Sequence, residues 1–175
     1  MATPAPGVLA PMSRTLLIVE DDSALAQMLA LHFEDEGYAC HRAARCAETL
    51  PQARQVRPDL VLLDQQLPDG SGVDQIAPLL AADPELPVVM MTGQHDLELA
   101  IEAISRGAAD FVHKPVKLGE LTATVARLVR HRDLAHSEDA GALPTPPPHR
   151  DLIGRSEAML TVSKEIALCA RSSAT

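Results

Sequence analysis

The feature that most constrains this chain is a regular alternation between short apolar runs and longer segments with helical periodicity. Apolar runs of strand length lie at residues 15–20, 59–64 and 87–93, and weaker strand patterns lie at 38–43 and 110–115. Unbroken apolar runs of this kind are typical of strands covered on both faces of a parallel sheet. The sequence therefore predicts an α/β fold in which five parallel strands alternate with helices.

The segments between these runs place apolar side chains at helical spacing. We expect helices from about residue 23 to Gly37, at 47–56, around 73–82, from Leu97 to Gly107 and from Leu118 to about 136. The segment 65–72 is expected to be a loop, with Gly70 and Gly72 as ordinary turn residues. Right-handed crossovers then predict a doubly wound sheet with its functional site beyond the carboxyl ends of the strands.

Charge and cysteine content exclude several classes of function. A formal net charge of −9 and a pI of about 5.1 make the chain a poor nucleic-acid binder as it stands. No apolar run approaches the length of a transmembrane helix. Three cysteines without a CxxC pair argue against a zinc site or a disulfide framework. We therefore expect a cytoplasmic protein that does not enter a membrane.

The sequence also divides into parts. Residues 1–13 lack a basic segment and a long apolar segment, so they are expected to be a disordered tail rather than a signal peptide. The strand and helix alternation fills residues 14–133. A proline-rich linker is expected at 134–150, because four prolines in five positions at 144–148 cannot continue a helix. Helical periodicity returns in residues 151–175.

Polar side chains gather where the predicted strands end. The first strand runs into Glu20, Asp21 and Asp22, the second buried strand ends at Asp64, and the last two end at Thr92 and Lys114. Because the carboxyl ends of parallel strands meet at one edge of a sheet, these side chains should converge. Carboxylates so close together repel one another unless a cation offsets their charge, and such oxygen ligands suit Mg²⁺. A lysine and a threonine beside them suit a phosphoryl group, which predicts phosphoryl transfer to Asp64.

Simpler structural roles are open for several of these residues. Asp22 or Ser23 could cap the following helix, and the acids could form a solvated turn. Asp64 alone could be a turn residue at a strand end. Phe111, considered by itself, is a core residue. The joint alignment of Asp64 and Lys114 with the acids favours the metal and phosphoryl site.

Five motifs in this order, VEDD, LVLLD, LPDGSG, MMTG and FVHKP, resemble those of a two-component response-regulator receiver domain over residues 14–133. The resemblance implies a flavodoxin-like (CheY-like) sheet with strand order 2-1-3-4-5, with Mg²⁺ as cofactor and a sensor histidine kinase as phosphoryl donor. It also implies residue roles: Asp64 as phosphoacceptor, Glu20 and Asp21 as metal-binding acids with the main-chain carbonyl of Gln66, Lys114 as the phosphate-binding lysine, and Thr92 and Phe111 as switch residues.

The chain departs from this family pattern at two positions, neither of which should abolish phosphorylation. Phe111 stands where tyrosine is common, and Glu20 stands where aspartate is common. The resemblance also implies a cis peptide bond between Lys114 and Pro115. The last predicted helix has an apolar stripe that must pack largely on the sheet, and its continuation past the sheet edge suggests a homodimer contact through the receiver.

Residues 151–175 resemble the opening of the AAA+ ATPase domain of sigma-54-dependent (NtrC-type) activators. In that family a GxxxxGK[ST] loop follows directly, and this chain has none, so it is expected to be a fragment of a longer activator. The resemblance implies that the full protein works with sigma-54 RNA polymerase, ATP and DNA. The fragment lacks the ATPase core, so we expect a regulatory domain that is not an enzyme and does not itself contact DNA.

Two other functions are compatible with parts of this pattern. A Mg²⁺-dependent aspartyl-phosphate phosphatase has related chemistry, but its DxD motif would place Glu20 at the nucleophile position. A receiver-like scaffold would bind partners without phosphorylation, against which the complete set of site residues argues. The main prediction is a phosphorylation-switched response regulator that controls assembly of a sigma-54-dependent transcription activator.

Overall fold

The computed structural model describes residues 14–93 and 97–138, all of which lie in one compact unit of the chain. The strands are β1 (Thr15–Val19), β2 (Ala39–Ala43), β3 (Leu60–Asp64), β4 (Gln66–Leu67), β5 (Gly70–Ser71), β6 (Val88–Thr92) and β7 (Asp110–His113). The helices are α1 (Ser23–Asp35), α2 (Cys46–Val56), α3 (Val73–Ala82), α4 (Leu97–Ser105) and α5 (Leu118–Glu138). The expected tail at 1–13, most of the expected linker and the ATPase-like segment lie outside the described residues.

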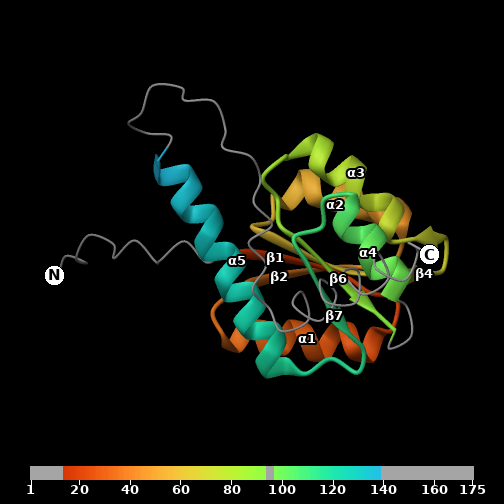
Figure 1. Ribbon diagram of the computed structural model, residues 1–175. Coiled ribbons are helices and arrows are strands. Elements are labelled where there is room, and N and C mark those ends of the chain that lie inside the picture. The colour runs from red at the N-terminus through yellow and green to blue at the C-terminus, as the bar shows by residue number, and fades with distance from the viewer. Residues whose placement is uncertain (1–13, 94–96, 139–175) are drawn as a thin grey trace, which may run out of the picture. The chain divides into compact units, whose positions relative to one another are not determined.

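Five of these strands form one parallel sheet in the order β2-β1-β3-β6-β7. Numbered within the sheet, this is the order 2-1-3-4-5, so the predicted doubly wound α/β fold is confirmed. Helices α1 and α5 cover one face of the sheet, and α2, α3 and α4 cover the other (Figure 1). Because all pairs are parallel, the carboxyl ends of the five strands lie along one edge.

The central strands are apolar because both of their faces are buried. Every residue of β3 and β6 is buried, and Leu16 and Leu62 have no exposed surface. These two leucines pack in one hydrophobic cluster with Phe33 of α1 and Val125 of α5. Burying a side chain of this size stabilises a fold by about 2 kcal/mol. A core of this kind therefore forms although the chain has only two phenylalanines and no tryptophan.

The ends of α1 follow the sequence signals. The Asp22 side chain accepts hydrogen bonds from the N–H groups of Ala24 (2.9 Å) and Leu25 (3.1 Å), so Asp22, and not Ser23, is the N-cap. Gly37 follows the C-cap residue with φ = 90°, a conformation that favours glycine. The prediction that Gly37 ends this helix is confirmed.

The structure differs from the sequence prediction in three segments. The segment 65–72, expected to be a loop, contains the two short antiparallel strands β4 and β5. The last strand of the sheet ends at His113 and not at Pro115. Proline has no N–H group with which to extend a strand ladder, so the strand stops before it. Helix α5 continues to Glu138, so residues 134–138, where we expected the linker to begin, are helical.

The turn between β4 and β5 also caps a distant helix. Asp69 accepts hydrogen bonds from the N–H groups of Cys46 (2.7 Å) and Ala47 (2.9 Å) at the start of α2. The N-cap residue Arg45 makes no side-chain capping bond itself. The bond from Ala47 is the main cause that holds the pKa of the Asp69 carboxyl below its usual value. The carboxylate therefore joins two segments that the sequence separates.

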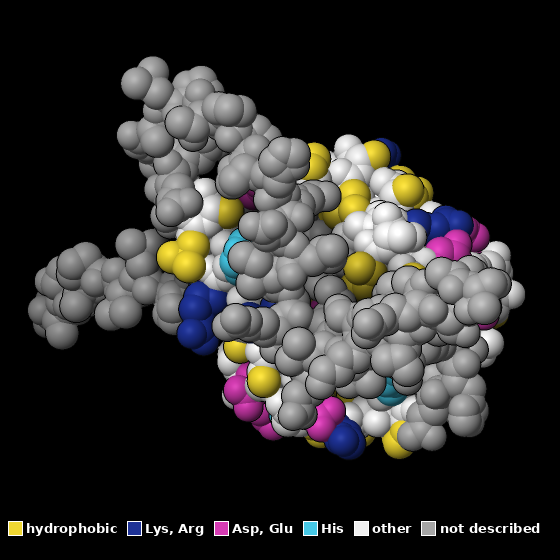
Figure 2. Space-filling model, in the orientation of Figure 1, with side chains coloured by type: hydrophobic (Ala, Val, Ile, Leu, Met, Phe, Trp, Pro, Cys, Tyr) yellow, Lys and Arg dark blue, Asp and Glu magenta, His cyan; other side chains and the backbone are white. Residues whose placement is uncertain are grey.

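Charged side chains of both signs lie side by side on the surface that Figure 2 shows. An example of such pairing is Arg106, whose guanidinium contacts Asp74 at 2.8 Å and Glu102 at 2.6 Å. Exposed ion pairs of this type each contribute under about 1 kcal/mol, so they do not determine the fold. None of the described helices is long and apolar enough to cross a membrane.

Candidate functional site

The parallel topology brings the polar strand ends to one edge of the sheet. Glu20 and Asp21 directly follow β1, Asp64 is the last residue of β3, and Thr92 is the last residue of β6. Lys114 directly follows β7, and its main-chain N–H donates a hydrogen bond of 2.7 Å to the carbonyl of Thr92. These five residues lie at or directly after the carboxyl ends of four strands, along one edge of the sheet.

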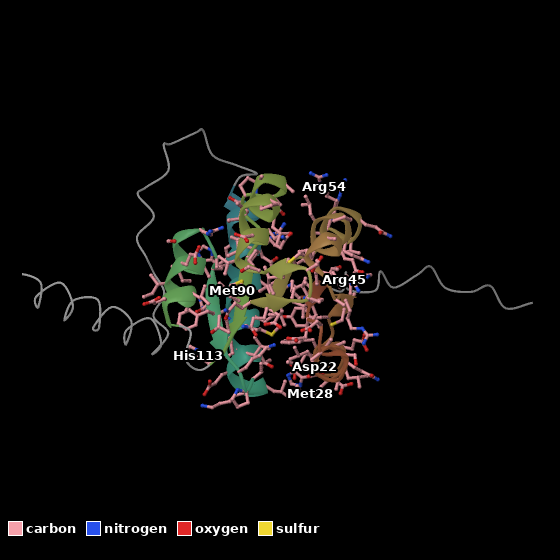
Figure 3. All side chains as sticks on the ribbon, turned by 90° about the vertical axis from the view of Figure 1, so that its right-hand side faces the viewer. Asp22, Met28, Arg45, Arg54, Met90 and His113 are labelled. Carbon is pink, nitrogen blue, oxygen red and sulfur yellow. The ribbon has the colours of Figure 1, made fainter. Side chains whose placement is uncertain are left out.

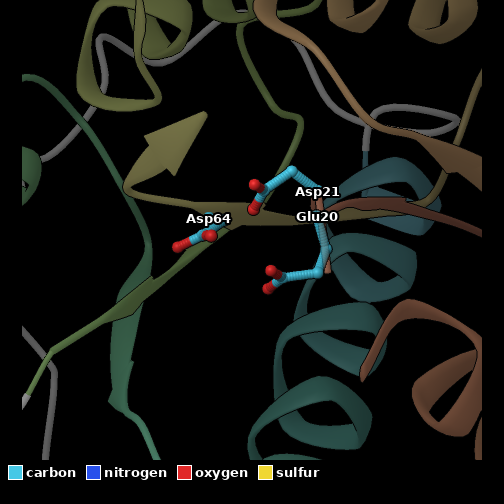
Figure 4. A group of neighbouring side chains, drawn as sticks. All are labelled: Glu20, Asp21 and Asp64. Carbon is cyan, nitrogen blue, oxygen red and sulfur yellow. The ribbon is translucent and has the colours of Figure 1, made fainter. Parts of the chain in front are cut away.

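Three carboxylates form the centre of the site. One oxygen from each of Glu20, Asp21 and Asp64 lies within 4.8 Å of the other two. Figure 4 shows the three carboxylates extending from the ends of β1 and β3 into the same space. Glu20 is 2% exposed and Asp64 is 5% exposed, whereas Asp21 is exposed. Two of the three negative charges are therefore largely removed from water, which makes their mutual repulsion costly.

Lys114 supplies the positive charge that these acids need. Its Nζ lies 2.8 Å from Oε2 of Glu20 and 2.9 Å from Oδ2 of Asp64. The Lys114 side chain is only 28% exposed, so the pairs are partly shielded from solvent. Burial by itself lowers the pKa of Lys114, but hydrogen bonds and charges of Glu20 and Asp64 outweigh it and raise the pKa. The ammonium group therefore stays charged between the two carboxylates.

Lys114 alone does not fully offset the cost of burying the negative charges of Glu20 and Asp64. Burial is the main cause that raises the pKa of Glu20 to about 7; the hydrogen bond from Lys114 opposes this rise, and the charge of Asp64 adds to it. A carboxyl group that is hard to ionise gains from a further cation nearby. The donor set consists of carboxylate oxygens with one exposed member, Asp21, and this set fits Mg²⁺.

Gln66 was expected to add its main-chain carbonyl to the metal ligands. It is the first residue of β4, and its N–H donates a long hydrogen bond of 3.4 Å to Oδ1 of Asp64. Gln66 is thus adjacent to the site, and the role of its carbonyl stays a prediction. The peptide bond between Lys114 and Pro115 is cis, which confirms what the family resemblance implied.

The two expected switch residues are both buried. Thr92 is 1% exposed and Phe111 is 5% exposed, so Phe111 has little further burial to gain. The Thr92 hydroxyl lies 3.2 Å from Nδ1 of His113, and the ring of His113 packs edge-to-face on Phe111 with centroids 5.2 Å apart. Sequence reasoning missed His113. The alternation along β7 would have placed it on the same side as Phe111, next to the end of β6.

Gly72 has a different role from the turn residue that we expected. Its φ of −59° is one that any residue adopts, so no special backbone conformation requires glycine there. A Cβ atom at this position would lie 1.9 Å from the main-chain oxygen of Asp64. Close approach of two backbone segments, and not turn geometry, therefore excludes a side chain at Gly72. The close packing of Gly72 against the main chain of Asp64 helps to fix the position of that acid.

Comparisons with known proteins show which family this chain is similar to. The model of the response regulator receiver domain family matches residues 16–126. The chain is 40% identical over 123 residues to the DNA-binding response regulator MtrA of Mycolicibacterium smegmatis, and this alignment covers 70% of the chain and 54% of MtrA. The chain therefore spans about half the length of this relative.

Two further matches extend over more of the chain. The transcriptional regulatory protein ZraR of Escherichia coli is 32% identical over 160 residues, which cover 91% of the chain and 36% of ZraR. The crystal structure of NtrX from Brucella abortus in complex with ATP matches with a TM-score of 0.71 and 29% identity. That match covers 91% of the chain and 35% of NtrX. An alignment of 160 residues must include part of the segment 139–175.

Proposed function

This chain belongs to the response regulator receiver domain family, and on that premise we propose that it accepts a phosphoryl group on Asp64 from a sensor histidine kinase. The observation that carries the proposal is the position of Asp64. Its Oδ2 lies 2.9 Å from Nζ of Lys114, and its carboxylate shares one cluster with those of Glu20 and Asp21. A nucleophilic oxygen, a fixed cation and two further acids are thus side by side.

In the proposed transfer, a carboxylate oxygen of Asp64 attacks the phosphorus of a phosphohistidine in line. The new O–P bond forms while the N–P bond breaks, and the electron pair returns to the imidazole, which takes up a proton. Lys114 is placed to pair with a phosphoryl oxygen on Asp64. Glu20, Asp21 and Asp64, with the Gln66 carbonyl, would hold Mg²⁺, which would neutralise charge on the phosphoryl oxygens.

Phosphorylation would then be transmitted by Thr92 and Phe111. We infer that the Thr92 hydroxyl turns toward the phosphoryl group and that packing around Phe111 adjusts to this movement. Phe111 lies in β7, between α4 and α5 in the chain, so the surface formed by α4, β7 and α5 is the expected output face. Phosphorylation can shift the population of active molecules only as far as it stabilises the active state more than the inactive one.

For the whole protein, we propose a transcriptional regulator that acts in the cytoplasm with sigma-54 RNA polymerase. The matches to ZraR and to NtrX support this proposal, because each covers 91% of the chain and so extends past the receiver. The NtrX structure holds ATP, which agrees with an ATPase domain beginning at residues 151–175. The receiver would control assembly of that domain, with a homodimer as the starting state and DNA bound elsewhere in the protein.

Intact-mass spectrometry after incubation with acetyl phosphate and Mg²⁺ tests the core of this proposal. We expect a single phosphoryl adduct in the wild type, and none with Asp64→Asn or in the presence of a chelator. Asp22→Asn is the matched control. The Asp22 side chain caps α1, and it is the main-chain N–H of Asp22, which the variant keeps, that donates a hydrogen bond to Glu20. This variant should take up the phosphoryl group as the wild type does.

The opposite outcomes are informative as well. A folded wild type that binds Mg²⁺ but gains no adduct would favour the scaffold that acts without phosphorylation. An adduct that persists in Asp64→Asn would place the chemistry on another residue. If the adduct forms as expected, sedimentation of the phosphorylated and unphosphorylated protein would show whether phosphorylation changes the oligomeric state.

A further inference from the structure

The ends of β6 and β7 hold a histidine for which the proposed phosphoryl transfer has no use. His113 is the last residue of β7, and in the parallel register it lies directly beside Thr92, the last residue of β6. Figure 3 shows His113 at the end of its strand, well away from Arg45 and Arg54 on α2. Neighbouring residues in register on parallel strands point to the same side of the sheet, so the two side chains meet.

The contacts of His113 join both of the proposed switch residues. Its Nδ1 lies 3.2 Å from Oγ1 of Thr92. Within residues 14–93 and 97–138, this is the one hydrogen bond of the Thr92 hydroxyl, which makes none to Asp64 or to Lys114. The His113 ring also packs on Phe111 at an interplanar angle of 73°. Thr92 is 1% exposed, so water does not compete for its hydroxyl.

We propose that His113 is a positioning residue that holds the Thr92 hydroxyl away from Asp64 in the unphosphorylated protein. The inference rests on the proposed function, because it gives Thr92 a phosphoryl oxygen as its later partner. Either tautomer of the histidine fixes the position of Oγ1, whichever group donates the proton. The hydroxyl must leave His113 before it can bind a phosphoryl oxygen, so the bond stabilises the unphosphorylated arrangement.

The size of the effect follows from the strength of one neutral hydrogen bond. Removing it should raise the population of molecules whose Thr92 is free to turn, and the apparent affinity for a phosphoryl group rises by the same factor. A net contribution typical of one such bond corresponds to about a twofold to tenfold change in affinity. Part of the free energy of phosphoryl binding is therefore needed to break the hydrogen bond between Thr92 and His113.

Binding of beryllofluoride, a stable phosphoryl mimic, in the presence of Mg²⁺ tests the proposal. Because the chain has no tryptophan whose fluorescence could report binding, the ¹³C NMR signal of the Thr92 methyl group is the readout. His113→Phe removes the hydrogen bond and keeps an aromatic ring against Phe111. His113→Asn keeps a hydrogen-bonding atom near the position of Nδ1. Thr92→Val removes the hydroxyl at nearly constant volume.

We expect His113→Phe to bind beryllofluoride about twofold to tenfold more tightly than the wild type. Its Thr92 methyl signal without beryllofluoride should move toward the bound position. His113→Asn should restore the wild-type affinity and signal. In the Thr92→Val background, His113→Phe should change the affinity no further, because the bond is already absent.

Two outcomes would overturn the inference while leaving the proposed function intact. His113→Phe could bind with wild-type affinity and show an unshifted Thr92 signal. Alternatively, its tighter binding could persist in the Thr92→Val background, which would mean that His113 acts through its packing on Phe111. Failure of the proposed function has a separate signature, since the wild type itself would then bind no beryllofluoride and take up no phosphoryl group on Asp64.

Discussion

At the scale of single residues, Lys114 supplies the positive charge that pairs with the buried carboxylates of Glu20 and Asp64. Its Nζ contacts Glu20 and Asp64 at 2.8 and 2.9 Å. Lys114→Met would leave two poorly exposed carboxylates unpaired, so we expect a loss of about 1–3 kcal/mol in the free energy of unfolding without Mg²⁺. Mg²⁺ should restore part of that loss, because it replaces the missing positive charge. Urea unfolding with and without a chelator measures both effects.

Lys117→Met is the matched control for this prediction. The Lys117 ammonium contacts Glu120 at 2.9 Å, but its side chain is 75% exposed. Removing this exposed pair should cost under about 0.5 kcal/mol and should not respond to Mg²⁺. Equal losses in the two lysine variants would contradict the view that Lys114 compensates the buried carboxylates.

Gly72 is the second residue with a role of its own. A methyl group there would overlap the main-chain oxygen of Asp64, since the two atoms would be 1.9 Å apart. Gly72→Ala should therefore lower the free energy of unfolding by about 2 kcal/mol or more. A Cβ at Gly119 in α5 meets nothing within 4 Å, so Gly119→Ala should be neutral or stabilising by up to about 1 kcal/mol. Thermal unfolding of both variants provides the comparison, and similar losses in both would refute the close-contact argument.

At the scale of an element, the three consecutive acids that precede α1 have different roles. Asp22 caps the helix by accepting from Ala24 and Leu25, whereas Glu20 and Asp21 belong to the carboxylate cluster. Asp22→Ala should cost about 1 kcal/mol of stability, and Asp22→Asn should cost little because asparagine also caps. Mg²⁺ affinity, measured by calorimetry, should be close to the wild-type value in Asp22→Asn. A large drop in that variant would make Asp22 a metal ligand and contradict the assignment.

Burial of Asp110 in β7, where it pairs with Arg127 of α5, makes the stability of the protein depend on pH. Asp110 is 4% exposed; burial is the main cause that raises its pKa, and its hydrogen bond from Phe111 and the charge of Arg127 oppose the rise. A carboxyl whose pKa is raised on folding contributes stability that is present below its unfolded pKa and is lost as pH rises through the folded pKa. Stability relative to Asp110→Asn should therefore fall as pH increases above about 4.

Urea unfolding of the wild type and of Asp110→Asn at a series of pH values checks this slope. Asparagine can still accept the hydrogen bond that Phe111 donates at 2.9 Å, so the variant removes the charge and keeps the local bond. A difference that grows in favour of the wild type with rising pH would show that the pair with Arg127, at 2.6 Å, outweighs the cost of burial.

At the scale of the described domain, Arg132 joins α5 to the edge of the sheet opposite the candidate site. Its Nη1 donates to the carbonyls of Pro58 (3.3 Å) and Asp59 (3.4 Å), which precede β3, and its Nη2 contacts Asp83 at 2.6 Å after α3. Arg132→Gln should lower the free energy of unfolding by about 2 kcal/mol. The exposed Arg130 on the same helix is the matched control, and Arg130→Gln should change stability by under about 0.5 kcal/mol.

Phosphorylation provides a second measurement for the same pair of variants. Arg132 binds the amino ends of the strands, and Asp64 lies at their carboxyl ends, so the rate of adduct formation should be unchanged in both. Slower phosphorylation in Arg132→Gln under conditions where it is fully folded would show that the two edges of the sheet are coupled.

Local patterns in the sequence were sufficient to predict the sheet and the position of its site. Strands buried on both faces require unbroken apolar runs, so β3 and β6 could be recognised from such runs in the local sequence. Their alternation with helices implied parallel pairing, and parallel pairing brings Asp64, Glu20 and Lys114 to one edge. The preference of aspartate and serine for the N-cap position also limited the N-cap of α1 to Asp22 or Ser23.

The tertiary structure alone decided the contacts between side chains that are distant in the sequence. Asp69 caps α2 from 23 residues away, Gly72 touches the main chain of Asp64 without any unusual φ, and His113 meets Thr92 across two strands. Periodicity reports which side of an element a residue occupies, but not which residue of another element it meets. That depends on the register and separation of packed elements, which are set by non-local contacts throughout the core.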